Sequence, residues 1–199
     1  MVMHLKKWLI SFIFIQILFT GAYAADQTPR AIRSSLHFDT FKTVPIQQGG
    51  RLKPLDTFAR ESVQTITGKT SFQGMSALDI LFSWLILPGA WSEVEMIEIP
   101  SPELKQKVGL PMEKKYFSVR QILARESLNR HFQELQEKKS HEEALSSTDE
   151  AVERLGMQLM VLDQVSRGDL WKILPHPKGA GEPWISLGAL LYGRSPEIS

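Results

Sequence analysis

Cysteine is absent from this 199-residue sequence. Without cysteine the chain has no disulfide framework, no thiolate metal site and no thiol redox chemistry. A chain of this length buries enough apolar surface to fold on a hydrophobic core alone. The absence therefore excludes several classes of redox and zinc proteins, but it does not argue against a stable folded domain.

The sequence also has no strong excess of positive or of negative residues. The 23 lysine and arginine residues are nearly balanced by 22 aspartate and glutamate residues, which gives a formal net charge of +1. Domains that bind nucleic acid carry a clear excess of positive charge, so the sequence predicts no nucleic-acid partner. A hydrophobic content of 43% and a charged content of 23% are typical of a globular protein.

Motifs of catalytic and metal-binding sites are lacking as well. His141-Glu142-Glu143 has no second histidine to complete H-E-x-x-H, and Gly179-Ala180-Gly181 lacks the lysine of a phosphate-binding loop. No G-x-S-x-G nucleophile motif occurs. We therefore expect a protein that is not an enzyme, with no metal site and no cofactor of its own. Four histidines beyond the N-terminal region are interpreted as solvated or helix-capping residues: His37, His131, His141 and His176.

Long hydrophobic runs are confined to the N-terminus. Lys6 and Lys7 precede an apolar run over 8–19, and Ala22 and Ala24 form an A-x-A cleavage pattern. A membrane-spanning helix needs about 20 apolar residues, so the run is short for a span. We predict a signal peptide over 1–24, with an uncleaved anchor as the alternative. The rest of the chain is then periplasmic or otherwise extracytoplasmic, and possible association with the membrane stays open.

The remaining sequence predicts a mainly α-helical fold with minor β structure. Apolar residues recur at helical spacing from Pro54 to Gly68, and proline is favoured in the first helical turn. The run over 77–87 is apolar nearly all round, which is typical of a helix in the centre of a fold or under a partner. Further elements are expected as helices over 102–108, 118–139 and 147–165 and a strand over 94–99.

Two long helices near the C-terminal half predict an antiparallel helical hairpin. Ser147-Thr148-Asp149-Glu150 has the pattern of a capping box, and a polar loop over 138–148 separates the two helices. The apolar face of the 118–139 helix shifts midway, so this helix either contacts two surfaces or breaks. The predicted organisation is therefore a linker over 25–44 followed by a single extracytoplasmic helical domain over 45–199.

The stretch PIQQGGRLKPLDTFARE, residues 45–61, is unusually rich in turn residues and charges. Gly49-Gly50 suits a tight reversal because glycine adopts positive φ without steric cost. Asp56 and Arg60 are spaced for an i, i+4 ion pair, which stabilises a helix by only about 0.2–0.5 kcal/mol. Local physics does not require all of these charges together. We therefore expect an interaction surface at Arg51, Lys53, Asp56, Arg60 and Glu61.

This stretch, continuing through Thr67-Gly68-Lys69, resembles a signature of the CcsA/ResC-type proteins of system II cytochrome c biogenesis. The later layout is similar too, with an apolar helix ending at Leu87-Pro88, a helix start at Phe117-Ser118 and a Trp184-Ile185-Ser186-Leu187 segment. The resemblance spans roughly residues 38–190, and its specific part is 45–61. The multi-span membrane part of that family, with its W-W-D segment and haem-ligand histidines, has no counterpart in this sequence.

The resemblance implies an extracytoplasmic domain of a haem delivery and attachment complex, detached from the membrane part or encoded as an accessory subunit. It would act by protein–protein docking, with haem held by a partner. That partner would be a multi-span membrane protein that handles haem, and apocytochrome c is a second possible partner. No haem ligand can be transferred to this chain. The sequence does not indicate an oligomeric state.

Two other functions stay open from the residues alone. The first is a general periplasmic interaction module unrelated to haem, which would use the 77–87 helix or the helical hairpin to bind a partner. The second is a carrier that itself binds haem or another ligand through His37 or His176.

Overall fold

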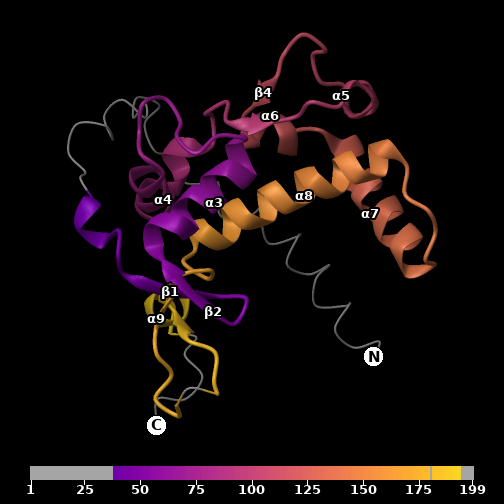
Figure 1. Ribbon diagram of the computed structural model, residues 1–199. Helices are drawn as coiled ribbons and strands as arrows, with labels where there is room; N and C mark the ends of the chain where they lie inside the picture. Colours follow the sequence, from indigo (N-terminus) through magenta and orange to yellow (C-terminus); the bar gives the residue numbers. More distant parts are fainter. Residues whose placement is uncertain (1–37, 180, 194–199) are drawn as a thin grey trace.

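The structure is a computed structural model that describes residues 38–179 and 181–193 (Figure 1). The predicted signal peptide over 1–24 lies outside the described residues, as do most of the predicted linker and His37. Among the described residues, no helix has both the length and the apolar character needed to cross a bilayer.

The described part of the chain is mainly helical, which confirms the predicted fold class. Its β structure consists of three small antiparallel two-stranded sheets. The helices are η2 (Asp39–Phe41), α3 (Leu55–Thr67), α4 (Ala77–Ile86), η3 (Pro88–Trp91), α5 (Pro102–Val108), α6 (Val119–Leu123), α7 (Glu126–Ser140), α8 (Ser147–Ser166) and α9 (Leu187–Leu191). The strand pairs are β1 (Pro45–Gln48) with β2 (Arg51–Pro54), β3 (Ile97–Glu98) with β4 (Tyr116–Phe117), and β5 (Lys172–Leu174) with β6 (Ile185–Ser186).

The core forms where α3, α4 and α8 pack together. Phe58 and Trp84 are completely buried, and the Trp171 ring meets Phe82 edge to face with ring centroids 5.0 Å apart. The indole Nε1 of Trp171 donates a hydrogen bond to the Val165 carbonyl oxygen at 3.0 Å. Burial of each such side chain stabilises the fold by about 1.5–3 kcal/mol. The apolar α4 helix is therefore a core element.

Helices α7 and α8 form the predicted helical hairpin, in which α7 contacts α8 and crosses it at a steep angle (Figure 1). Lys138 near the end of α7 pairs with Asp149 at the start of α8, with 2.7 Å between Nζ and Oδ2. Gly156 of α8 lies against the ring of Phe132 of α7, where an added Cβ would be 3.0 Å from a ring carbon. Glycine at this position therefore allows the two helices to approach closely.

The predicted 118–139 helix breaks into α6 and α7. Ala124 ends α6, and Arg125 adopts an extended conformation with φ −95° and ψ 99°. Ile122 of α6 and Leu128 of α7 are both buried. In one continuous helix these two apolar faces would point in different directions. The break turns the chain so that both faces reach the core.

Three predicted boundaries were wrong in detail. Pro54 closes strand β2 and serves as the N-cap of α3, so the helix begins one residue later. The capping box of α8 uses Ser146 rather than Ser147, because the Ser146 side chain is the one that reaches the N–H of Asp149. The strand expected over 94–99 shrinks to Ile97–Glu98, since only these residues pair with β4.

Candidate interaction surface

Residues 45–54 form a β-hairpin in front of α3. Pro45 pairs with Pro54 and Gln48 with Arg51, which leaves Gly49 and Gly50 as a two-residue turn. Their φ angles are +57° and +76°. Two-residue turns with positive φ at both positions match the twist of a hairpin. The glycine pair therefore forms the tight reversal that the sequence predicted.

Lys53 ties this hairpin to α3. Its Nζ lies 2.8 Å from Gln48 Oε1 across the hairpin and 2.5 Å from Glu61 Oε2 on the helix. Ile46 lies opposite Lys53 in the antiparallel pairing of β1 and β2 and is completely buried. Lys53 and Glu61 thus pair their charges where the hairpin meets α3.

Asp56 and Arg60 form the predicted ion pair on α3, with 2.8 Å between Oδ2 and Nε. The arginine side chain is mostly exposed, so solvent weakens the contribution of this pair to stability. Asp56 also lies in the first turn of α3, where a negative charge interacts favourably with the helix dipole. Nearby, the hydrogen bond that Lys42 donates to the Asp39 carboxylate raises the pKa of Lys42 above its ordinary value.

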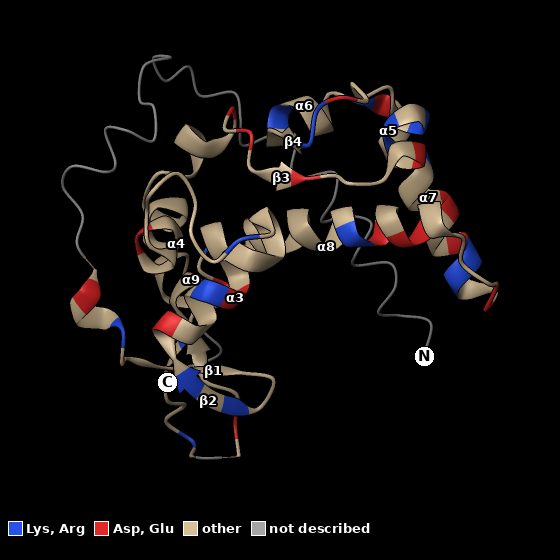
Figure 2. Cartoon of the chain, turned by 45° about the horizontal axis from the view of Figure 1, so that its top comes forward, with Lys and Arg blue, Asp and Glu red and all other residues tan. Residues whose placement is uncertain are grey.

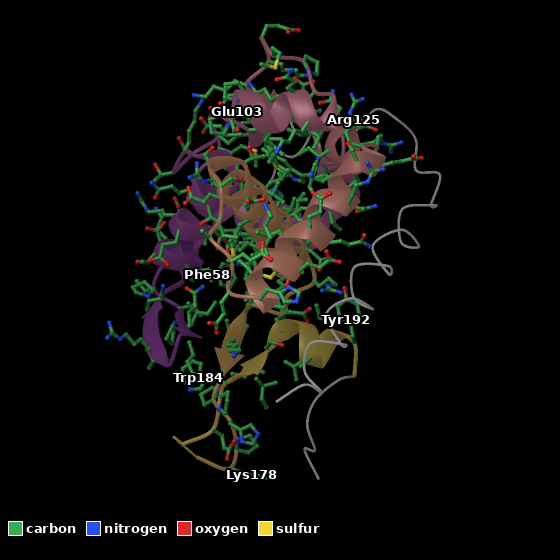
Figure 3. The ribbon with its side chains drawn as sticks, turned by 90° about the vertical axis from the view of Figure 1, so that its right-hand side faces the viewer. Phe58, Glu103, Arg125, Lys178, Trp184 and Tyr192 are labelled. Atoms are coloured by element: carbon green, nitrogen blue, oxygen red, sulfur yellow. The ribbon has the colours of Figure 1, made fainter. Side chains whose placement is uncertain are left out.

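Gln47 connects the hairpin to the C-terminal part of the chain. Its Oε1 accepts a hydrogen bond from the backbone N–H of Trp184 at 2.7 Å. Figure 3 shows Trp184 at the end of the molecule where the C-terminal strands lie. The sequence analysis missed this role, because the two residues are 137 positions apart and no local pattern links them.

The tip of the hairpin carries two exposed side chains. Arg51 is exposed and has no ion pair or hydrogen-bond partner for its side chain among the described residues. Leu52 beside it is 59% exposed, although large aliphatic side chains usually lie inside. The sequence analysis did not single out Leu52, because strand β2 was not predicted and the exposure of a single leucine depends on tertiary contacts.

The structure thus brings the five predicted residues to one end of the molecule, on β2 and α3 (Figure 2). Four of them pair with each other: Lys53 with Glu61, and Asp56 with Arg60. Only Arg51 lacks a partner among the described residues. We name the exposed pair Arg51 and Leu52 the hairpin tip.

The described histidines do not converge on a common site. His131 contacts Glu134, His141 contacts the Glu137 carbonyl oxygen, and His176 accepts from the backbone N–H of Lys178. These are local contacts within four residues, and His141 is the C-cap residue of α7. Within residues 38–179 and 181–193, no group of three or more potential ligand side chains is placed to hold a metal ion.

Comparison with known proteins gives one informative similarity. The chain is 30% identical over 152 residues to Protein NrfI of Wolinella succinogenes. The match covers 72% of this chain and 16% of NrfI. No family model matches the chain. The resemblance to CcsA/ResC-type proteins is therefore supported as a distant similarity to one protein of that kind, over its soluble part.

Proposed function

We propose that this chain is an extracytoplasmic accessory component of cytochrome c maturation. The observation that carries the proposal is the similarity to NrfI, a CcsA/ResC-like cytochrome c biogenesis protein. The signature-like stretch over 45–61 also supports it, and its β2 strand carries the exposed side chains of Arg51 and Leu52. The similarity extends to a small part of NrfI, so the activity of the whole NrfI protein is not transferred to this chain.

The chain acts in this proposal by docking rather than by catalysis. The hairpin tip presents an unpaired guanidinium beside an exposed leucine. Arginine is enriched among the residues that dominate binding energy, and burial of a leucine side chain contributes about 1.5–3 kcal/mol. Lys53 and Glu61 then link the hairpin to α3, and Asp56 and Arg60 pair with each other within α3.

The proposed partner is a multi-span membrane protein that handles haem, with apocytochrome c as a second candidate. Docking at an extracytoplasmic surface requires export, for which the N-terminal segment over 1–24 is the proposed signal. In this proposal haem enters the complex through the partner.

The first test is deletion of the gene in the organism that encodes it, followed by haem-stained gels of c-type cytochromes. Loss of the covalent haem bands, restored by the intact gene, is the expected result. Unchanged bands in the deletion strain would contradict a required role in cytochrome c maturation.

A spectroscopic test separates docking from haem carriage. Haem added to the full-length chain is expected to give no Soret band that depends on His37 or His176. A saturable Soret band that disappears in His37→Ala or His176→Ala would overturn the docking account in favour of a carrier.

A further inference from the structure

The segment from β5 to α9 carries exposed apolar side chains at the same end of the molecule as the hairpin (Figure 1). Leu174, Leu190, Leu191 and Tyr192 are each between 38% and 59% exposed. Trp184, at the start of β6, is half-buried. We name these five residues the C-terminal face. Large apolar side chains usually lie inside a protein, and a group of them on the surface marks a binding site.

Strand pairing brings Leu174 and Trp184 together beside the hairpin. Leu174 lies opposite Ile185 in the pairing of β5 and β6, and Trp184 directly precedes Ile185. The backbone N–H of Trp184 donates a hydrogen bond to Gln47 of β1. Gln47 lies opposite Leu52, and side chains of directly opposite residues lie on the same face of a sheet. The C-terminal face therefore adjoins the hairpin tip without sharing a residue with it.

Helix α9 is anchored at its start. The backbone N–H of Leu187 donates to the Trp171 carbonyl oxygen at 2.8 Å, and that of Gly188 donates to the Gly168 carbonyl oxygen at 2.9 Å. A Cβ on Gly188 would lie 2.5 Å from a backbone oxygen, so the close contact requires glycine at this position. Leu187 packs against the core, whereas Leu191 one turn later is 59% exposed. The exposed apolar residues of the last turn therefore belong to an anchored helix.

Positive charge accompanies the C-terminal face. Lys172 of β5 and Lys178 of the loop between β5 and β6 make no ion pair among the described residues. Glu182 is the only acidic residue of the sequence over 170–193. The neighbouring hairpin tip adds the exposed guanidinium of Arg51. This end of the molecule therefore complements a negatively charged surface.

The composition of the C-terminal face matches a lipid bilayer better than a protein partner. Leucine side chains enter the boundary between headgroups and acyl chains, and tryptophan and tyrosine favour the headgroup level. Lysines near the surface attract anionic headgroups. Protein–protein interfaces, by contrast, are depleted in lysine. A symmetric dimer through this face would bring the same positive charges together, which disfavours a second copy as the occupant.

We propose that the C-terminal face lies on an anionic lipid bilayer, with the last turn of α9 in the interfacial layer and Lys172 and Lys178 at the headgroups. The inference rests on the proposed function in one respect, because a membrane-spanning partner at the hairpin tip brings a bilayer to this end. Contact with the bilayer would then orient the hairpin tip toward a partner in the same membrane. The two claims can be tested separately, because binding to lipid requires neither the partner nor haem.

The test uses the full-length chain, whose lack of cysteine allows one fluorophore to be attached at a chosen position. Leu191→Cys and Leu174→Cys carry the environment-sensitive fluorophore NBD on the C-terminal face, and Glu103→Cys carries it on exposed α5 as the control. Vesicles consist of phosphatidylcholine alone or of equal parts of phosphatidylcholine and phosphatidylglycerol, with a nitroxide-labelled lipid as quencher. The fluorophore reports its own surroundings, so binding of the N-terminal segment to the vesicle does not by itself quench it.

We expect the nitroxide lipid to quench the label at positions 191 and 174 but not at position 103. This quenching should require phosphatidylglycerol, because the lysines need an anionic surface. Circular dichroism of each labelled protein verifies that the fold is kept.

Charge variants test the role of the lysines, with the label at position 191 as the readout. Each basic residue near an anionic surface strengthens binding about fivefold. Lys172→Gln with Lys178→Gln should therefore lower the ratio of inserted to free label at least about fivefold. Lys107→Gln with Arg130→Gln removes the same charge from exposed positions of α5 and α7 and should leave this ratio unchanged.

Four outcomes would overturn the proposal. Equal quenching at position 103 would show that the chain binds vesicles without a preferred face. Equal quenching on phosphatidylcholine alone would contradict recognition of anionic headgroups. A signal at position 191 that changes with protein concentration in the absence of vesicles would identify a second copy as the occupant. No quenching at position 191 in any vesicle would exclude lipid as the occupant. The deletion test of cytochrome c maturation is independent of all four.

Discussion

At the scale of single residues, the carboxylate of Asp149 takes part in both a helix cap and an ion pair between two helices. Its Oδ2 accepts hydrogen bonds from the backbone N–H and the side-chain hydroxyl of Ser146, at 2.9 and 2.7 Å. The same oxygen pairs with Lys138 on the facing helix. One carboxylate therefore completes the N-terminus of α8 and joins it to the end of α7.

Ser146→Ala tests the corrected start of α8. The variant loses the hydroxyl that accepts from the Asp149 N–H, and loss of such a cap lowers the free energy of unfolding by about 0.5–2 kcal/mol. Urea denaturation provides the measurement. Ser147→Ala is the matched control and should change the free energy of unfolding by less than about 0.5 kcal/mol. A larger loss of stability in Ser147→Ala than in Ser146→Ala would instead support Ser147 as the cap of α8, as the sequence predicted.

Asp149→Asn tests the pH dependence of the same contact. Hydrogen bonds from Lys138 and Ser146 hold the pKa of Asp149 well below its ordinary value. A lowered folded-state pKa adds stability that is present above the unfolded-state pKa, about 3.9, and is lost as the pH falls toward the folded-state pKa.

The parent chain should accordingly exceed Asp149→Asn in free energy of unfolding at pH 7. This advantage should shrink progressively below about pH 4. Urea denaturation at a series of pH values measures it. A difference that stayed constant down to pH 2 would contradict the assigned cause.

At the scale of elements, the β1–β2 hairpin depends on its two-residue turn. Gly50 has a φ of +76°, a conformation that costs a residue with a Cβ about 1–2 kcal/mol. Gly50→Ala should therefore lower the free energy of unfolding by roughly that amount. Gly89→Ala is the control, because Gly89 has no positive φ and an added Cβ there would meet no atom within 4 Å.

Thermal or urea denaturation compares these two glycine variants. Equal stability of Gly50→Ala and Gly89→Ala would show that the turn does not need its left-handed conformation. Gly49→Asn should be tolerated better than Gly50→Ala, since asparagine is favoured at the first central position of such turns.

The helical elements could be predicted from local patterns, because periodicity and caps are local properties of the sequence. Ser76 and Ser118 cap α4 and α6 as their sequence positions indicate. Strand β2 was missed because Pro54 was read as a helix residue, and proline suits either the end of an edge strand or a helix start. Short strands such as β4 and β5 have no periodicity of their own, so only tertiary pairing defines them.

At the scale of the whole molecule, the candidate surface was predicted only in part. The charges over 51–61 lie at one end of the fold, but the pairing of Lys53 with Glu61 depends on the angle between the hairpin and α3. The bond from Trp184 to Gln47 and the exposure of Leu52 both depend on contacts between distant segments. A single sequence carries no signal for this hydrogen bond or for the exposure of Leu52.

The measurement that tests the central claim most directly is the content of c-type cytochromes in a deletion strain complemented with hairpin-tip variants. Arg51→Glu with Leu52→Asp changes two exposed side chains, and the free energy of unfolding should change by less than about 1 kcal/mol. Lys107→Glu on α5, an exposed charge reversal outside the hairpin, is the control. Circular dichroism of each variant verifies folding.

We predict that the tip variant accumulates as a folded protein but leaves covalent haem at the level of the deletion strain, whereas Lys107→Glu restores it. Full restoration of c-type cytochromes by the tip variant would contradict docking through the hairpin tip.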